Sequence, residues 1–303
     1  MWILAAILAL VLLAGLGLWI ALQRNAPAVL DAVDTIAGPA SSVEMVHEAS
    51  TGPAAHQRLF VYRDKGADGP LPVFVFFHGG AWAHGDPADY GFIARNIAPA
   101  GHIVVLGGYR MNEPGRYPAM LQDTAATLGW VHRNIADFGG DPERMVLSGH
   151  SAGAYNVMQV ALERRWLEAE SVPAEAIRGV VGIAGPYDFY PFDTDRSRDA
   201  FASVGAGPES QPVNHASAAA PPVLLVHGED DVTVRIRNSR SLARALEAEG
   251  APVETLFLAG KDHNAPLLAL TNPWRRDPQV FDRVTSFLRE TTEVSVPVKP
   301  QTP

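Results

Sequence analysis

A serine between two glycines stands where an apolar run meets a run that favours a helix. Gly149–Gly153 has the pattern G-x-S-x-G, with Ser151 at its centre. The apolar run Arg144–Ser148 comes directly before it and Ala154–Trp166 directly after it. A strained strand-to-helix turn of this kind lifts a hydroxyl out of a sheet, and glycine avoids a collision with the neighbouring elements. Ser151 is therefore a candidate nucleophile, and a plain glycine-rich surface turn is the alternative.

A second glycine motif offers donors for an oxyanion. His78–Trp82 has the sequence HGGAW and ends the apolar run Pro72–Phe77. Acyl transfer needs backbone N–H groups aimed at the carbonyl oxygen as it gains negative charge. We expect Gly79 and Gly80 to supply two of them, with the N–H of Ala152, and the histidine of the motif to support the turn.

The general base must come from the histidines that follow the serine, since the chain order of such sites is serine, acid, histidine. Only His215, His227 and His263 do so. His227 lies within an apolar run, where a structural role is favoured. His263 lies in the polar loop Gly260–Asn264, after the last predicted strand, and is the predicted base.

The carboxylate that would partner the predicted base is less well defined by the sequence. Glu229, Asp230 and Asp231 all lie in the turn that follows Pro222–Gly228, and spacing alone does not choose among them. Asp188, at the end of the preceding predicted strand, is a competitor, although Pro186-Tyr187-Asp188 is also typical of a turn capped by its own aspartate.

Short apolar runs alternate with longer amphipathic ones, which predicts an α/β fold with a mostly parallel sheet covered by helices on both faces. Helices are predicted over Tyr117–Phe138, after Ser151, after Val234 and near Pro278. The predicted strands are Arg58–Tyr62, Pro72–Phe77, His102–Leu106, Arg144–Ser148, Gly179–Gly185, Pro222–Gly228 and Val253–Leu258.

Composition excludes several functions. The formal net charge of −9 argues against binding nucleic acid phosphates, and the absence of cysteine excludes disulfides and thiolate chemistry. A length of 303 residues fits one catalytic domain, over 58–290, with a flexible tail over 291–303.

The N-terminal run Trp2–Leu22 carries no charge and is long enough for a membrane helix. We therefore expect a transmembrane helix or signal anchor over 1–24 and a linker over 25–57. The domain is expected on the outer, periplasmic side. Export after signal cleavage near Ala26–Ala28 is the alternative.

These motifs together resemble the carboxylesterase branch of the α/β-hydrolase superfamily, which includes hormone-sensitive-lipase-like, feruloyl-esterase-like and isoprenylcysteine-methylesterase-like proteins. HGGAW, NIADFGGDPERMVLSGHSAGA, HGEDDVTV and a late Asp-His occur here in the family's order. In that pattern the acid falls on Asp231, and Ala81 replaces a third glycine.

The resemblance implies a serine esterase that forms an acyl-enzyme on Ser151, with His263 as base and Asp231 as its partner. It implies a small-molecule ester substrate and neither metal nor cofactor. Trp82, Tyr155, Tyr187 and Phe189 are candidates to line the substrate pocket, with core packing as the alternative. An arylformamidase or peptidase with the same triad, and an inactive membrane-tethered binding protein, are the rival functions.

Overall fold

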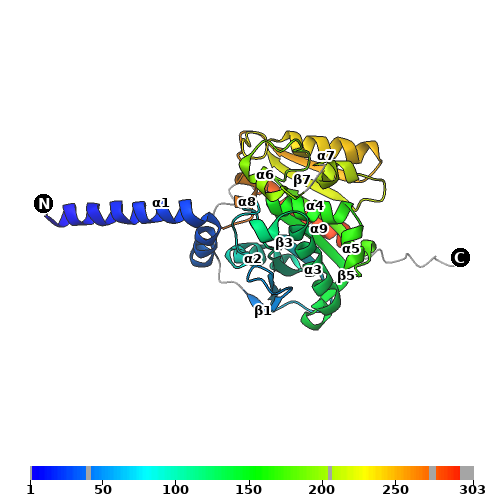
Figure 1. Cartoon of the computed structure of the whole chain (residues 1–303). Helices are drawn as coiled ribbons and strands as arrows, with labels where there is room; N and C mark the ends of the chain where they lie inside the picture. Colours follow the sequence, from blue (N-terminus) through cyan, green and yellow to red (C-terminus); the bar gives the residue numbers. More distant parts are fainter. Residues whose placement is uncertain (1, 39–41, 204–206, 273–277, 294–303) are drawn as a thin grey trace.

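One eight-stranded sheet forms the centre of the protein (Figure 1). A computed structural model describes residues 2–38, 42–203, 207–272 and 278–293. The strands lie in the order β1-β2-β4-β3-β5-β6-β7-β8. The first two pairings, β1 with β2 and β2 with β4, are antiparallel, and all others are parallel. The strands are β1 (Val43–Ser50), β2 (Arg58–Asp64), β3 (Leu71–Phe77), β4 (Ile103–Gly107), β5 (Gly140–His150), β6 (Ile177–Ile183), β7 (Val223–Gly228) and β8 (Val253–Leu258).

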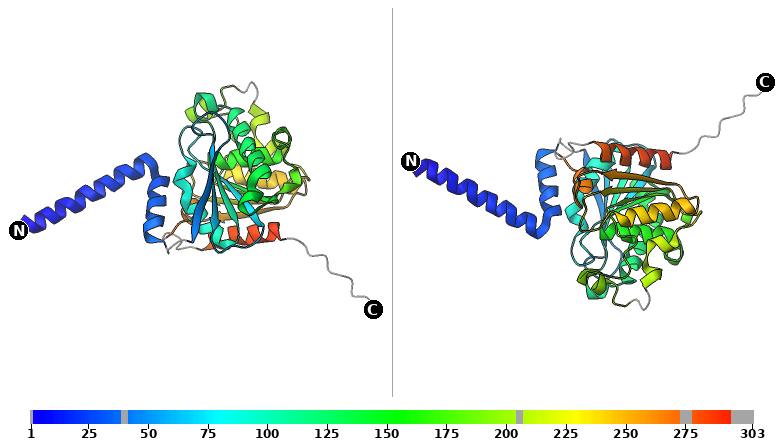
Figure 2. Two further views of the ribbon diagram at one scale, coloured as in Figure 1. Left: turned by 90° about the horizontal axis from the view of Figure 1, so that it is seen from below. Right: turned by 90° about the horizontal axis from the view of Figure 1, so that it is seen from above.

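Helices cover both faces of this sheet (Figure 2). Alternate residues of the central strands point to opposite faces, so Val73, Val75 and Phe77 pack in one apolar cluster and Phe74 and Phe76 in the other. The helices are α1 (Trp2–Ala37), α2 (Gly91–Ile97), α3 (Ala119–Asn134), α4 (Ala152–Leu162), α5 (Arg165–Ala169), α6 (Asp195–Ala200), α7 (Arg237–Ala248), α8 (Ala265–Leu268) and α9 (Gln279–Thr292).

The predicted α/β architecture is confirmed. All seven predicted strands form, and the predicted helices appear as α3, α4, α7 and α9. α3 continues through a 3-10 turn to Phe138, where Gly139 ends it with a φ of 82°. The predicted flexible tail over 291–303 is wrong for its first two residues, because α9 runs to Thr292; residues 294–303 lie outside the described part of the chain.

The segment expected to be a linker is instead ordered. β1 lies within it and pairs with β2. The helix α1 breaks at Asn25, whose φ of −155° and ψ of 80° are not helical. Asn25 Oδ1 accepts from Ala28 N–H at 3.2 Å, so Asn25 caps a new helical segment with Pro27 in its first turn.

This second segment of α1 is joined to the domain by a buried polar network. Asp34 is 3% exposed. Its carboxylate accepts from Arg95 Nε at 2.8 Å, from Asn96 Nδ2 at 2.9 Å and from the backbone N–H of Asn272 at 2.8 Å. Arg95 also pairs with Asp31 at 2.6 Å. Residues of α1, α2 and the turn after α8 are therefore held together by one carboxylate.

The first segment of α1 extends away from the domain (Figures 1 and 2). Several of its leucines are more than half exposed: Leu10, Leu12, Leu13, Leu16 and Leu18. Among the described residues, no helix combines the length and apolarity that crossing a membrane requires, so the predicted transmembrane helix is not supported.

Candidate active site

Ser151 lies on a strained turn between β5 and α4. Its φ of 54° falls in the left-handed region, which residues with a Cβ rarely adopt. The Ser151 N–H donates to Ile183 O at 2.9 Å, which ties the turn to the end of β6. The serine therefore stands at the carboxyl edge of the parallel strands and at the N-terminus of α4, where developing negative charge is favoured.

The flanking glycines leave no room for side chains. A Cβ on Gly149 would lie 2.4 Å from the carbonyl carbon of Gly153, and one on Gly153 would lie 2.2 Å from Phe77 O. Both distances are far inside van der Waals contact. The predicted need for glycine on each side of Ser151 is confirmed.

The loop after β3 passes beside this turn. A Cβ on Gly79 would lie 3.0 Å from His150 O and 3.2 Å from Ser151 Cβ, which is tighter than most Cβ contacts, so glycine allows this backbone to approach the serine closely. Gly80 has a φ of 117°, and a Cβ there would lie 2.0 Å from His84 O.

In the described ranges, none of the N–H groups of Gly79, Gly80 and Ala152 donates to a backbone carbonyl of a turn or loop. A backbone hydrogen bond from Gly79 does reach the buried Tyr90 hydroxyl. For Gly80 and Ala152 these observations are consistent with the predicted role as oxyanion donors.

The side chain of His78 holds that loop in place. Its Nδ1–H donates to Gly79 O at 2.7 Å, and its ring stacks on Tyr109 with centroids 4.6 Å apart. Burial lowers the pKa of His78 to about 4, so the ring is neutral at pH 7. Ala81, which replaces the third glycine of the family pattern, adopts a φ of 51° that glycine would adopt without strain.

Asp231 and His263 form the shortest charged contact of the site. Asp231 Oδ2 lies 2.6 Å from His263 Nδ1, although the two residues are 32 positions apart. Asp231 Oδ1 accepts the backbone N–H groups of Thr233 and Val234, both at 2.8 Å. Because a carboxylate only accepts, His263 Nδ1 carries the proton and Nε2 is left as the basic nitrogen.

A second histidine binds the same carboxylate. His227 Nε2 lies 3.1 Å from Asp231 Oδ2 and 2.7 Å from Val234 O, and Ser239 Oγ lies 2.7 Å from His227 Nδ1. Both oxygens bound by Nε2 are acceptors, so Nε2 carries the proton and Ser239 donates to Nδ1. Burial by itself raises the pKa of Asp231, but the hydrogen bonds from His227 and His263 outweigh it and hold this pKa well below its usual value.

His150 links the nucleophile turn to the histidine loop. Its Nε2 donates to His263 O at 3.1 Å, and the two rings lie 4.8 Å apart. Burial, and next to it the charge of His263, lowers the pKa of His150 to about 3. The residue before Ser151 thus contacts the predicted base. Within the described residues no hydrogen bond joins Ser151 Oγ to His263; such contacts often tighten only when substrate binds.

A cavity of about 340 Å³ opens at Ser151. Trp82 and Phe189 line it, as expected from the sequence. Tyr155 and Tyr187 are fully buried and lie outside its lining. Tyr155 packs edge-on against Trp82, with ring centroids 5.4 Å apart. It therefore contacts a residue that lines the cavity without lining the cavity itself. The core-packing alternative therefore fits Tyr155 and Tyr187.

Comparison with known proteins identifies the family of this chain. The BD-FAE family model matches residues 59–246, which include Gly79, Gly80, Ser151 and Asp231. The chain belongs to the BD-FAE family. This confirms the resemblance to carboxylesterases of the α/β-hydrolase fold.

Relatives of this BD-FAE family member are named as esterases. Isoprenylcysteine alpha-carbonyl methylesterase ICME of Arabidopsis thaliana is 31% identical over 78% of this chain and 60% of its own length. Esterase LipC of Mycobacterium tuberculosis is 29% identical over 67% and 56%. The chain therefore spans less than two thirds of these curated relatives.

Solved structures share the fold of this BD-FAE family member. A thermostable esterase from Pseudomonas putida ECU1011 has a TM-score of 0.68 and 25% identity over 89% of this chain and 90% of that one. Esterase B from Lactobacillus Rhamnosis has a TM-score of 0.76 at 18% identity over 92% and 95%, which shows the fold alone.

Two residues of this BD-FAE site were missed by sequence reasoning. His227 was assigned a purely structural place in its strand, and His150 was only a variable position of the G-x-S-x-G motif. His227 and Asp231 are four residues apart and lie on either side of one turn. This spacing could have indicated that their side chains are in contact.

Proposed function

We propose that this protein is a serine hydrolase that cleaves carboxylic esters through Ser151, Asp231 and His263. The observation that carries the proposal is the 2.6 Å contact between Asp231 and His263, beside the turn that holds Ser151. That contact fixes the tautomer in which His263 Nε2 accepts a proton. The esterase names of its relatives support the choice of carboxylic esters.

The proposed reaction has two steps. Ser151 Oγ attacks the ester carbonyl while His263 Nε2 takes its proton, and the N–H groups of Gly79, Gly80 and Ala152 stabilise the oxyanion. Collapse of the tetrahedral intermediate expels the alcohol, which receives its proton from His263. Water then attacks the acyl-serine by the same proton transfers and releases the acid. Asp231 stays ionised throughout and stabilises the imidazolium.

Turnover of 4-nitrophenyl esters tests this proposal, with Ser151→Ala as the variant. The loss should reach about 10³-fold or more, since the nucleophile is removed while the fold keeps its contacts. A fluorophosphonate probe should add its mass to the peptide that contains Ser151 in the wild type only. A Ser151→Ala variant that retains a tenth of the activity would refute the assignment. N-formyl aryl amides and aminoacyl naphthylamides in the same assay would distinguish the amide hydrolases.

We also propose, from the apolar run Trp2–Leu22 and the exposed leucines of α1, that this segment attaches the enzyme to a membrane, with the domain on the outer, periplasmic side. Expression in a bacterial host followed by carbonate extraction tests the attachment, and protease treatment of spheroplasts tests the side. Recovery of the full-length chain in the soluble fraction would refute attachment. A chain that begins near Ala26–Ala28 would show signal cleavage instead.

A further inference from the structure

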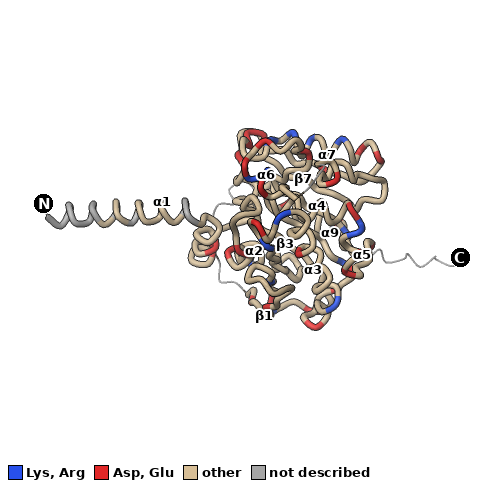
Figure 3. The backbone as a smooth tube through the Cα atoms, viewed as in Figure 1, with Lys and Arg blue, Asp and Glu red and all other residues tan. Residues whose placement is uncertain are grey.

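Three arginines line the cavity that opens at Ser151. Arg196 belongs to α6, Arg235 to the turn before α7 and Arg237 to the first position of α7. A single acidic residue, Asp193, joins them in the lining. Three guanidinium groups against one carboxylate give this cavity a positive charge. The whole chain, by contrast, has a formal net charge of −9, and acidic segments are spread over the domain (Figure 3).

The cavity arginines differ from Arg198 and Arg240 of the same helices in having no acidic partner among the described residues. Among the described residues, no carboxylate lies within 4.0 Å of Arg196, Arg235 or Arg237. On the same two helices, Arg198 pairs with Asp195 at 2.5 Å and Arg240 pairs with Glu229 at 2.8 Å. Arg198 and Arg240 are thus neutralised within the protein, whereas the three arginines that line the cavity are not.

The backbone under Arg235 and Arg237 is fixed by Asn238. This residue is buried, and its Oδ1 accepts the backbone N–H groups of Tyr187 and Asp188 at 3.0 and 2.9 Å. Its Nδ2 donates to Arg235 O at 3.0 Å. These hydrogen bonds of Asn238 therefore join the start of α7 to the loop after β6. Arg235 and Arg237 are themselves exposed, so a ligand in the cavity can reach their side chains.

The helix α6, which carries Arg196, is also held in place. A capping box holds α6, with Ser197 N–H donating to Thr194 Oγ1 at 3.0 Å and Thr194 N–H to Ser197 Oγ at 3.2 Å. Arg196 Nη2 donates to His84 Nε2 at 3.4 Å. Since His84 N–H donates to Gly80 O, this contact joins α6 to the loop that carries the proposed oxyanion donors.

A guanidinium group presents paired donors that match the oxygens of a carboxylate or a phosphate. Unpaired guanidinium groups in a concave site also attract anions over several ångströms. We propose that this enzyme prefers esters that carry an anionic group, a carboxylate or a phosphate, and that Arg196, Arg235 and Arg237 bind that group while Ser151 attacks the ester. The proposal rests on the proposed function, because it assigns a substrate class to the same site.

Matched esters test the preference. Methyl 4-acetoxybenzoate is neutral. The compounds 4-acetoxybenzoate and 4-acetoxyphenyl phosphate carry a carboxylate and a phosphate, both on the alcohol side of the acetyl ester. Mono(4-nitrophenyl) adipate and its methyl ester place the charge on the acyl side. For the full chain in detergent, kcat/KM should be about tenfold higher for at least one anionic ester than for its neutral counterpart. Raising the salt from about 0.01 M to about 1 M should remove most of this difference.

Variants separate the arginines of the cavity from those outside it. Arg235→Gln/Arg237→Gln and Arg196→Gln should each lower the ratio of kcat/KM for the preferred anionic ester to kcat/KM for its neutral counterpart, by about tenfold in the double variant. Arg240→Gln and Arg198→Gln are the matched controls, because these arginines are already paired. Neither should alter the ratio of anionic to neutral turnover.

The outcomes distinguish this inference from the proposed function. Ester turnover with no anionic preference, or with a preference that the cavity variants leave unchanged, would overturn the inference alone. If the folded wild type cleaves no ester, the proposed function fails. Calorimetry with Ser151→Ala then decides the inference: tighter binding of the anionic than of the neutral esters, lost with Arg235→Gln/Arg237→Gln, would support it. Equal binding would overturn it.

Discussion

Asp231 Oδ2 lies 2.6 Å from His263 Nδ1, and solvent does not reach the Asp231 carboxylate. A buried carboxylate in this position holds one ring tautomer and stabilises the cation that forms when the ring takes a proton. It can do both only while it is ionised. The hydrogen bonds that lower the pKa of Asp231 keep it so through mildly acidic pH.

Asp231→Asn should therefore reduce kcat for 4-nitrophenyl esters by about 10⁴-fold, with KM little changed, because an amide favours the wrong tautomer of His263. Steady-state kinetics at pH 7 on the folded variant provide the measurement.

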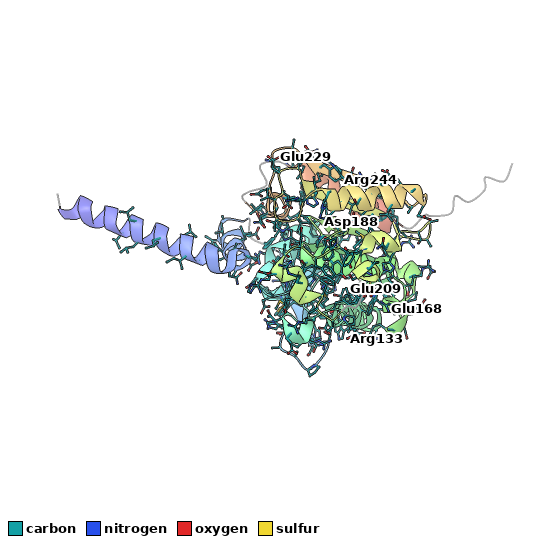
Figure 4. The ribbon with its side chains drawn as sticks, turned by 45° about the horizontal axis from the view of Figure 1, so that its top comes forward. Arg133, Glu168, Asp188, Glu209, Glu229 and Arg244 are labelled. Carbon is teal, nitrogen blue, oxygen red and sulfur yellow. The ribbon has the colours of Figure 1, made fainter. Side chains whose placement is uncertain are left out.

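Asp188→Asn is the matched control for this change. Asp188 lies beside α7 (Figure 4), and its backbone N–H donates to Asn238 Oδ1 at 2.9 Å. Its carboxylate makes no hydrogen bond or ion pair among the described residues, so its loss should change kcat less than about threefold. Were Asp188→Asn the inactive variant and Asp231→Asn the active one, the acid would have been assigned to the wrong strand.

The second histidine on Asp231 leads to a separate prediction. His227→Gln should lower kcat by about 10- to 100-fold with little change in KM, since a hydrogen bond to a charged group contributes about 1.5–3 kcal/mol. A purely structural role for His227 would lower the free energy of unfolding and leave kcat of the folded variant close to that of the wild type.

Ser239→Ala serves as the control for His227. It removes the donor to His227 Nδ1 but keeps His227 Nε2 on Asp231. Its kcat should therefore lie between those of the wild type and His227→Gln. Equal losses in both variants would show that general disruption of α7, and not the contact with Asp231, explains the effect.

The sequence indicated the site better than it indicated the N-terminal region. Ser151 and His263 follow from motif and chain order, because a strained turn accepts few residue types, whereas Asp231 was selected from its neighbours only by the resemblance to the family. The second segment of α1 was missed because Pro27 and its polar neighbours are typical of a linker, although Asn25 two residues before Pro27 matches a helix cap. The cavity arginines were missed for another reason: which of 21 arginines converge is decided by the packing of α6 and α7, not by local pattern.

Two truncations test the role of α1. Deleting residues 1–24 keeps Asn25 as the cap of the docked segment, so the domain should retain its stability and its activity. Deleting residues 1–41 also removes Asp31, Asp34 and Leu30, and leaves Arg95 and Asn96 without the carboxylate that binds both. The free energy of unfolding should then fall by about 2–5 kcal/mol.

Urea unfolding followed by circular dichroism measures this difference between the two truncations. Asp34→Asn in the shorter deletion is an intermediate control, because it keeps the helix but removes the charge that Arg95 binds. Equal stability of the two truncations would show that the docked segment contributes nothing to the fold.

The last prediction concerns acid stability. His78, His102 and His150 are buried, and burial lowers their pKa values to about 4, 4 and 3. In the unfolded chain a histidine takes up its proton near pH 6.5. Between about pH 6.5 and pH 4 the unfolded state therefore binds up to about three more protons at these positions than the folded state. Their stabilising effect is complete above about pH 6.5 and is lost as the pH falls towards 4.

The free energy of unfolding should accordingly decline by about 1.4 kcal/mol per pH unit for each histidine once the pH is below 6. Urea titrations at about pH 7, 6, 5 and 4.5 give this slope. His102→Phe, remote from Ser151 and of similar ring size, should reduce the slope by about a third and leave kcat unchanged. Asp231 does not contribute in this window, because its depressed pKa removes stability only below about pH 4. A slope that is unaltered in His102→Phe would mean that this histidine takes up its proton equally in both states.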